Sequence, residues 1–90
     1  MRRDIDKKLY QELIDTKFTF VKRGERNISE IYDSVKKRFP ELCDDDYFCS
    51  DHCRSGGKQP EWNHVVRSAM QNKTIDNLKF TGKKGFWIFY

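Results

Sequence analysis

Hydrophobic residues recur at helical spacing in two segments of the first half of the chain. The first segment predicts a helix over about residues 4–16 from apolar residues spaced by four: Ile5, Leu9 and Leu13. The second begins with the sequence Asn27-Ile28-Ser29-Glu30, a capping box that satisfies the first backbone amides of a helix. The apolar residues of this segment form one helical stripe: Ile28, Ile31, Tyr32, Val35 and Phe39. They predict a second helix that ends before Pro40.

The second half of the chain predicts a third helix followed by a β-hairpin. Pro60 suits the first turn of a helix that continues to Gln71. Its buried stripe is predicted from four apolar positions: Trp62, Val65 or Val66, Ala69 and Met70. Further along, the apolar residues Leu78 and Phe80 flank the polar Lys79, a pattern that predicts the first strand of a hairpin. The turn Gly82-Lys83-Lys84-Gly85 follows it. Alternation resumes at Phe86, Ile88 and Tyr90, which predicts the second strand of the hairpin.

The connection between the first two helices is predicted to hold a short strand. Residues 17–22 alternate between polar and apolar positions, and the charged residues from Lys22 to Arg26, with Gly24 among them, predict a turn. The predicted order is therefore helix, strand, helix, loop, helix and hairpin. We expect one α+β domain over residues 1–90, with three helices, a small antiparallel sheet and a C-terminal hairpin.

The segment from Glu41 to Gln59 is predicted to be a loop that contains all three cysteines of the chain. A loop this long in a small domain usually needs something that holds it in place. Cys43, Cys49 and Cys53, with His52 beside them, supply enough ligands for a tetrahedral zinc site. The spacing lacks the usual pair of cysteines two residues apart. We therefore favour buried or free thiols, with zinc or one disulfide as alternatives, and we expect no required cofactor.

Positive charge is concentrated in two parts of the chain. Residues 21–40 carry six basic and three acidic residues, and residues 61–90 carry five and two. Residues 41–60, by contrast, carry two basic and five acidic residues. Among these, Asp44-Asp45-Asp46 is expected to form a solvated acidic loop rather than a cation site. A basic surface of this kind attracts polyanions, although the net charge of +4 is ordinary for a small domain.

The polar face of the predicted third helix has side chains that can bind DNA. Arg pairs bidentately with guanine, and Asn and Gln pair with adenine. The candidate residues for contact with bases are Asn63, His64, Arg67, Ser68 and Gln71. Three lysines of the hairpin are candidates for phosphate contacts: Lys79, Lys83 and Lys84. The alternative is an ordinary solvated helix face and hairpin.

The order of elements resembles a winged helix-turn-helix, and short motifs resemble winged-helix domains attached to restriction endonucleases. The helix motif is Trp62, Val66, Arg67 and Ala69 in W-x-x-x-V-R-x-A spacing, and Gly85-Phe86-Trp87-Ile88 closes the hairpin. The segment Leu42-Cys43-Asp44-Asp45 is also similar to the cysteine-bearing loop that precedes the helix in these proteins. The resemblance covers about residues 28–90. The chain departs from the family pattern at residues 72–77, which separate the helix from the hairpin.

This resemblance implies a module that reads double-stranded DNA in a restriction or defence system, with a nuclease domain or subunit as a partner. The chain lacks the acidic and lysine residues of a D…E-x-K nuclease site, so we expect no catalysis by the chain itself. The alternative function is a winged-helix module that binds another protein. The chain has no long apolar run and no signal-peptide pattern, so we expect a cytoplasmic protein without a membrane partner.

Overall fold

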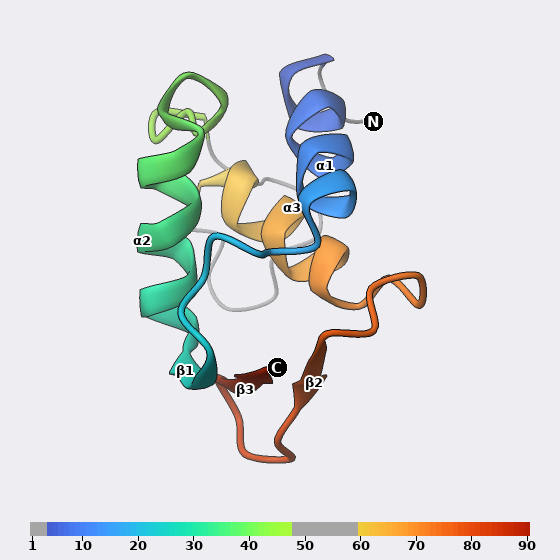
Figure 1. The fold of residues 1–90 in the computed structure, drawn as a ribbon. Coiled ribbons are helices and arrows are strands. Elements are labelled where there is room, and N and C mark those ends of the chain that lie inside the picture. Colours follow the sequence, from blue (N-terminus) through green and yellow to red (C-terminus); the bar gives the residue numbers. More distant parts are fainter. Residues whose placement is uncertain (1–3, 48–59) are drawn as a thin grey trace.

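The computed structural model describes residues 4–47 and 60–90, which form three α-helices and one three-stranded antiparallel sheet (Figure 1). In chain order the elements are α1 (Asp4–Thr16), β1 (Gly24–Asn27), α2 (Ile28–Arg38), the short 3₁₀ helix η1 (Pro40–Leu42), α3 (Glu61–Met70), β2 (Leu78–Phe80) and β3 (Phe86–Phe89). The described part of the chain is therefore α+β, as the sequence predicts.

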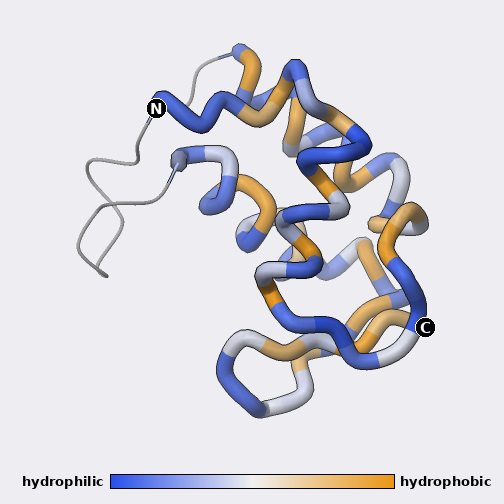
Figure 2. The backbone as a smooth tube through the Cα atoms, turned by 90° about the vertical axis from the view of Figure 1, so that its left-hand side faces the viewer, coloured by the Kyte–Doolittle hydropathy of each residue, from blue (hydrophilic) through white to orange (hydrophobic). Residues whose placement is uncertain are grey.

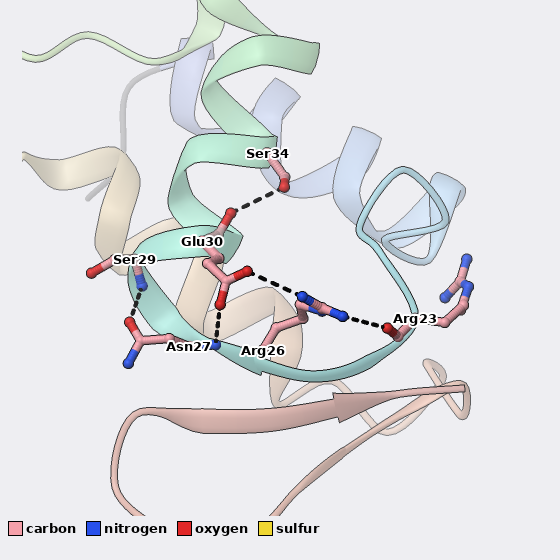
Figure 3. A network of polar contacts seen from close by, with 6 residues as sticks. All are labelled: Arg23, Arg26, Asn27, Ser29, Glu30 and Ser34. Atoms are coloured by element: carbon pink, nitrogen blue, oxygen red, sulfur yellow. Dashed lines mark hydrogen bonds and ion pairs between the residues drawn. The ribbon is translucent and has the colours of Figure 1, made fainter.

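All three predicted helices are present, and the second begins with the predicted capping box (Figure 3). The Ser29 amide donates to the Asn27 side-chain oxygen over 2.8 Å, and the Asn27 amide donates to a Glu30 carboxylate oxygen over 3.3 Å. Hydrogen bonding of the Asn27 amide, followed by that of the Arg26 guanidinium, lowers the pKa of the Glu30 carboxyl. The start of α2 is thus fixed by its own sequence.

The predicted strand over residues 17–22 is wrong, and so is the predicted turn that follows it. Lys17 and Phe18 have φ angles of 53° and 58°, which place them in the left-handed region and end α1 in a turn. Val21 bonds back to Phe18 over 3.1 Å in a second turn, and both of these apolar side chains enter the core. The strand instead lies at Gly24–Asn27, where the backbone pairs with the end of the chain.

The sheet has β3 at its centre, with β1 and β2 on either side. Gly24 pairs with Phe89 and Asn27 with Phe86 on one side, whereas Leu78 pairs with Phe89 on the other. Side chains alternate between the two faces of a strand, so Trp87 and Phe89 share the face that is turned towards the helices. This explains two of the four apolar positions of β3, whereas Phe86 and Ile88 lie on the other face and are partly buried.

One hydrophobic core connects the helices to the sheet. It includes the predicted stripes of all three helices, and both Val65 and Val66 are buried in it. Phe18 and Phe89 join the connection after α1 to the sheet, with their ring centroids 6.3 Å apart. The fully buried side chains include Leu9, Leu13, Ile31 and Val35. The helices lie on one side of the sheet, and the hairpin extends away from them at the far end (Figure 1).

The segment between α3 and β2 is held against α1 rather than extending into solvent. The Asn72 side-chain amide donates to the Tyr10 hydroxyl over 2.9 Å, and the Asn77 amide donates to the Lys17 carbonyl over 2.8 Å. Ile75, between them, is buried. These contacts fix the direction in which the chain leaves α3 and therefore the position of the hairpin. No described helix has the length and apolar character needed to cross a membrane.

Candidate nucleic-acid interface

The hairpin turn between β2 and β3 has a defined conformation that presents two lysines. Gly82 and Gly85 adopt φ angles of +92° and +84°, which other residues rarely adopt, so glycine is required on both sides of Lys83-Lys84. The Thr81 hydroxyl accepts from the Lys83 amide over 3.1 Å, and the Phe86 amide donates to the Lys83 carbonyl over 3.0 Å. The tip is hydrophilic between two hydrophobic strands (Figure 2).

The turn is also attached to the first residue of α2. The Ile28 amide donates to the Gly85 carbonyl over 2.7 Å. This bond satisfies a backbone donor at the helix terminus, where no carbonyl within the helix can accept from it. The N-terminus of α2 therefore lies against the hairpin, and its Asn27 and Glu30 side chains are occupied by capping.

The three predicted lysines of the hairpin do not form one cluster. Lys84 lines a groove between the hairpin and the helices. The Lys83 ammonium lies over the Phe86 ring, 4.6 Å from its centroid, in a cation–π contact. Lys79 is exposed, and strand alternation places its side chain on the opposite face from its neighbours Leu78 and Phe80. The lysines thus surround the hairpin rather than extending the surface of α3.

The five predicted residues of the third helix all lie outside its buried stripe. Gln71, at the C-cap of α3, is exposed. The other four are partly buried: Asn63, His64, Arg67 and Ser68. The five residues therefore lie outside the core-facing stripe of α3, but of the five only Gln71 is exposed to solvent rather than partly buried. Arg67 is the member of this set that reaches the hairpin side of the molecule, because it lines the same groove as Lys84.

The groove is an open concavity of about 440 Å³ formed by α2, α3, β2, β3 and the hairpin turn. Its lining residues come from five separate segments: Ile28, Tyr32, Arg67, Phe80, Gly82, Lys84, Gly85 and Trp87. Arg67 and Lys84 supply its two charges, and both are positive. The volume is within the range of roughly 300–1,000 Å³ that is typical of small-ligand sites. The groove therefore combines apolar walls with cationic side chains.

Three aromatic residues make up most of the apolar wall. The rings of Phe80 and Trp87 contact each other at a centroid distance of 5.1 Å, and Phe80 remains 47% exposed. Tyr32 packs edge-on against Trp62, with centroids 5.7 Å apart. Trp62 itself is a core residue, as predicted, so Trp87 is the tryptophan that lines the groove.

Sequence reasoning did not identify Tyr32 and Phe80 as site residues. The sequence places Tyr32 in the core stripe of the second helix and Phe80 in the alternation of a strand. The position of Phe80 could have indicated that its side chain is exposed, because a residue at the end of a short edge strand, next to a turn, has few core residues to pack against. The position of Tyr32 depends on the approach of the hairpin, which helical spacing does not reveal.

The described part of the predicted zinc site has a structural role. The Cys43 side chain is buried and contacts the Val35 carbonyl oxygen at 4.0 Å. Burial raises the pKa of its thiol to about 12, which disfavours the thiolate that zinc binds. The other three candidates, His52, Cys49 and Cys53, lie outside the described residues. Within residues 4–47 and 60–90, no group of three or more His, Cys, Asp or Glu residues is arranged to hold a metal ion.

Comparisons with known proteins add no family to this description. No protein-family model matches the sequence, and no curated protein or solved structure is significantly similar to it.

Proposed function

We propose that this chain is a winged-helix module that binds double-stranded DNA, with α3 in the major groove and the hairpin on the phosphate backbone. The order of helices and strands supports this proposal, since a hairpin follows the third helix and its second strand is central in the sheet. A helix that inserts into the major groove brings an adjacent hairpin close to the backbone.

The observation that carries the proposal is the shared groove of Arg67 and Lys84. The first belongs to α3 and the second to the hairpin turn, 17 positions later in the chain, yet both line one concavity. A surface that binds DNA needs such cationic groups from separate elements, because neighbouring phosphates must be contacted together. Lys83, in the hairpin turn, and Gln71, at the C-cap of α3, are further exposed polar residues of the same two elements.

A role in a restriction or defence system is a further part of the proposal. It rests only on the resemblance of residues 42–45, 60–69 and 85–88 to winged-helix domains attached to restriction endonucleases. In that setting the chain would read DNA, and a separate nuclease domain or subunit would cut it.

A second candidate function is the binding of another protein. The observation that favours it is the exposure of two aromatic residues at the sheet: Phe80 is 47% exposed and Tyr90 is 63% exposed. The Phe80 ring lies 5.1 Å from the Trp87 ring, and a contiguous apolar patch of this kind is typical of interaction sites. Salt separates the two functions, because phosphate contacts weaken steeply as salt rises whereas an apolar interface does not.

The experiment is a titration of a labelled random-sequence duplex followed by fluorescence anisotropy at several salt concentrations. Lys83→Ala and Lys84→Ala should each weaken binding to every sequence and reduce the salt slope by about 1. Arg67→Ala should weaken binding to a preferred sequence by about 1–3 kcal/mol if the side chain contacts a base. Lys73→Ala removes an equal charge from the exposed loop after α3 and is the matched control. Unchanged affinity and slope in all three variants would contradict the proposal.

A further inference from the structure

The aromatic groove between α2, α3 and the hairpin has more apolar wall than phosphate contacts require. Lysine and arginine side chains on a flat surface suffice to bind a phosphate backbone. Here the two cations are accompanied by the rings of Tyr32, Phe80 and Trp87. The combination of aromatic platforms with cations is characteristic of proteins that bind unpaired nucleotides.

We propose that this groove binds one unstacked nucleobase, with its ring against the aromatic wall and its flanking phosphates near Arg67 and Lys84. This inference rests on the proposed function, because it assigns a nucleotide ligand to the same surface. It deepens that function, because the protein would bind one unstacked base in addition to its contacts with paired DNA.

Charge complementarity selects a nucleotide over an apolar peptide as the occupant. The groove lining contains two cations and no acidic residue. The Nε atom of Arg67 is buried, and no described residue accepts a hydrogen bond from it. A buried donor without an acceptor is costly, and Arg67 lines the groove, so we expect its guanidinium to turn towards an occupant that supplies acceptors. Nucleotides carry such acceptors on both the base edge and the phosphate.

The exposure of the wall also fits a stacking role. Phe80 has nearly half of its surface in solvent although it lies beside Trp87 at 5.1 Å. An exposed ring supported by a second ring forms a rigid platform whose surface is available to a ligand. Base–aromatic stacking tolerates any base, since every base presents an aromatic face.

The base could reach the groove from a single strand or by extrusion from a duplex, and affinity measurements on the full chain separate these sources. The probes are a fully paired duplex, the same duplex with one central mismatch, and a single strand of equal length. Extrusion is easiest at a mismatch. We expect both the mismatched duplex and the single strand to bind about tenfold more tightly than the paired duplex if one base stacks in the groove. A preference for the mismatched duplex alone would identify extrusion as the source.

Phe80→Leu tests the aromatic wall without removing a core residue. It should abolish the preference for mismatched and single-stranded DNA and change the affinity for paired duplex by less than about twofold. Tyr90→Leu is the matched control, because Tyr90 is also an exposed aromatic residue of the sheet region but does not line the groove. In an NMR titration with the single strand, the indole N–H signal of Trp87 should shift, while that of the buried Trp62 should not.

The outcomes separate this inference from the proposed function. Equal affinity for all three probes, or equal weakening of all three by Phe80→Leu, overturns the base-binding groove while paired-duplex binding stands. Binding of the mismatched duplex and single strand without binding of the paired duplex supports the groove and rejects the reading of paired DNA. Failure of every probe to bind rejects both and leaves the groove as a surface for a protein partner.

Discussion

Asp45 joins the segment after α2 to both α2 and α3 through its two carboxylate oxygens. One oxygen accepts from the Lys36 ammonium over 2.6 Å, and the other accepts from the indole N–H of Trp62 over 2.8 Å. These two hydrogen bonds, with that of Lys36 the larger cause, lower the pKa of the Asp45 carboxyl. Trp62 is only 6% exposed, so its N–H depends on this acceptor.

We expect Asp45→Ala to lower the free energy of unfolding by about 1–2 kcal/mol at pH 7, mainly because the buried indole donor loses its acceptor. Asp45→Asn should cost less, since its side-chain oxygen can still accept from Trp62. The ion pair adds little, because the Lys36 and Asp45 side chains are 38% and 59% exposed. Urea denaturation measures both values, and Asp46→Asn is the control for removing a neighbouring carboxylate.

The charge contribution of Asp45 has a predictable pH dependence. A carboxyl with a lowered folded-state pKa stabilises the fold above its ordinary pKa, near 3.8, and this stability is lost as the pH falls through the folded-state value. The difference in the free energy of unfolding between the native protein and Asp45→Asn should therefore be constant from pH 7 to pH 5 and decrease below about pH 4. A difference that grows on acidification would show that another group causes it.

Single residues also show how far sequence reasoning reaches. The core role of Trp62 was predicted from helical spacing, and the structure confirms it. The role of Asp45 was not predicted, because Asp44-Asp45-Asp46 presents three identical side chains and spacing cannot select one of them. Its partner Trp62 lies 17 positions away, and helical spacing does not predict a contact at that separation.

At the scale of elements, α2 is the clearest case in which local sequence determines structure. Its capping box and apolar stripe act within one helix, so both could be predicted without knowledge of the rest of the chain. β1 is the opposite case. The residues Gly24–Asn27 have little strand propensity, and they become a strand because β3 provides backbone partners. The groove could not be predicted for the same reason, since its residues come together only through packing.

The cap of α2 supplies a quantitative prediction for an element. Asn27→Ala removes the oxygen that accepts from the Ser29 amide, so we expect the free energy of unfolding to fall by about 1 kcal/mol. Asn27→Asp retains an acceptor at the same position and should stay within a few tenths of a kcal/mol of the native protein. Urea denaturation compares the two variants. Hydrogen exchange at Ser29 should accelerate in Asn27→Ala alone; equal exchange in both variants would contradict a capping role.

At the scale of the whole molecule, the fold joins the start of one basic region to the hairpin of the other, while Lys36, Lys37 and Arg38 lie in the last turn of α2, at its opposite end. Residues 21–40 contain α2, and residues 61–90 contain α3 and the hairpin. The hydrogen bond from Ile28 to Gly85 connects these regions at 2.7 Å. The acidic segment between these regions follows the C-terminus of α2. Among its described residues, Asp45 pairs there with Lys36. The proposed DNA surface is therefore at the end of the molecule away from this acidic segment.

Binding at that surface should stabilise the whole fold in a salt-dependent way. A ligand that binds only the folded chain, at 100 times its dissociation constant, raises the free energy of unfolding by about 2.7 kcal/mol. For a domain of this size, that corresponds to a rise in Tm on the order of 10 °C. We expect this rise with a short duplex at low salt. At physiological salt the rise should be smaller, because counterions released into a more concentrated solution contribute less free energy to binding. The double variant Lys83→Ala/Lys84→Ala should keep the Tm of the free protein within a few degrees, since both side chains are exposed and the cation–π contact of Lys83 is weak at an exposed site. Its rise in Tm with duplex should be reduced. A stabilisation that persists in this variant and at high salt would place the ligand on an apolar surface elsewhere.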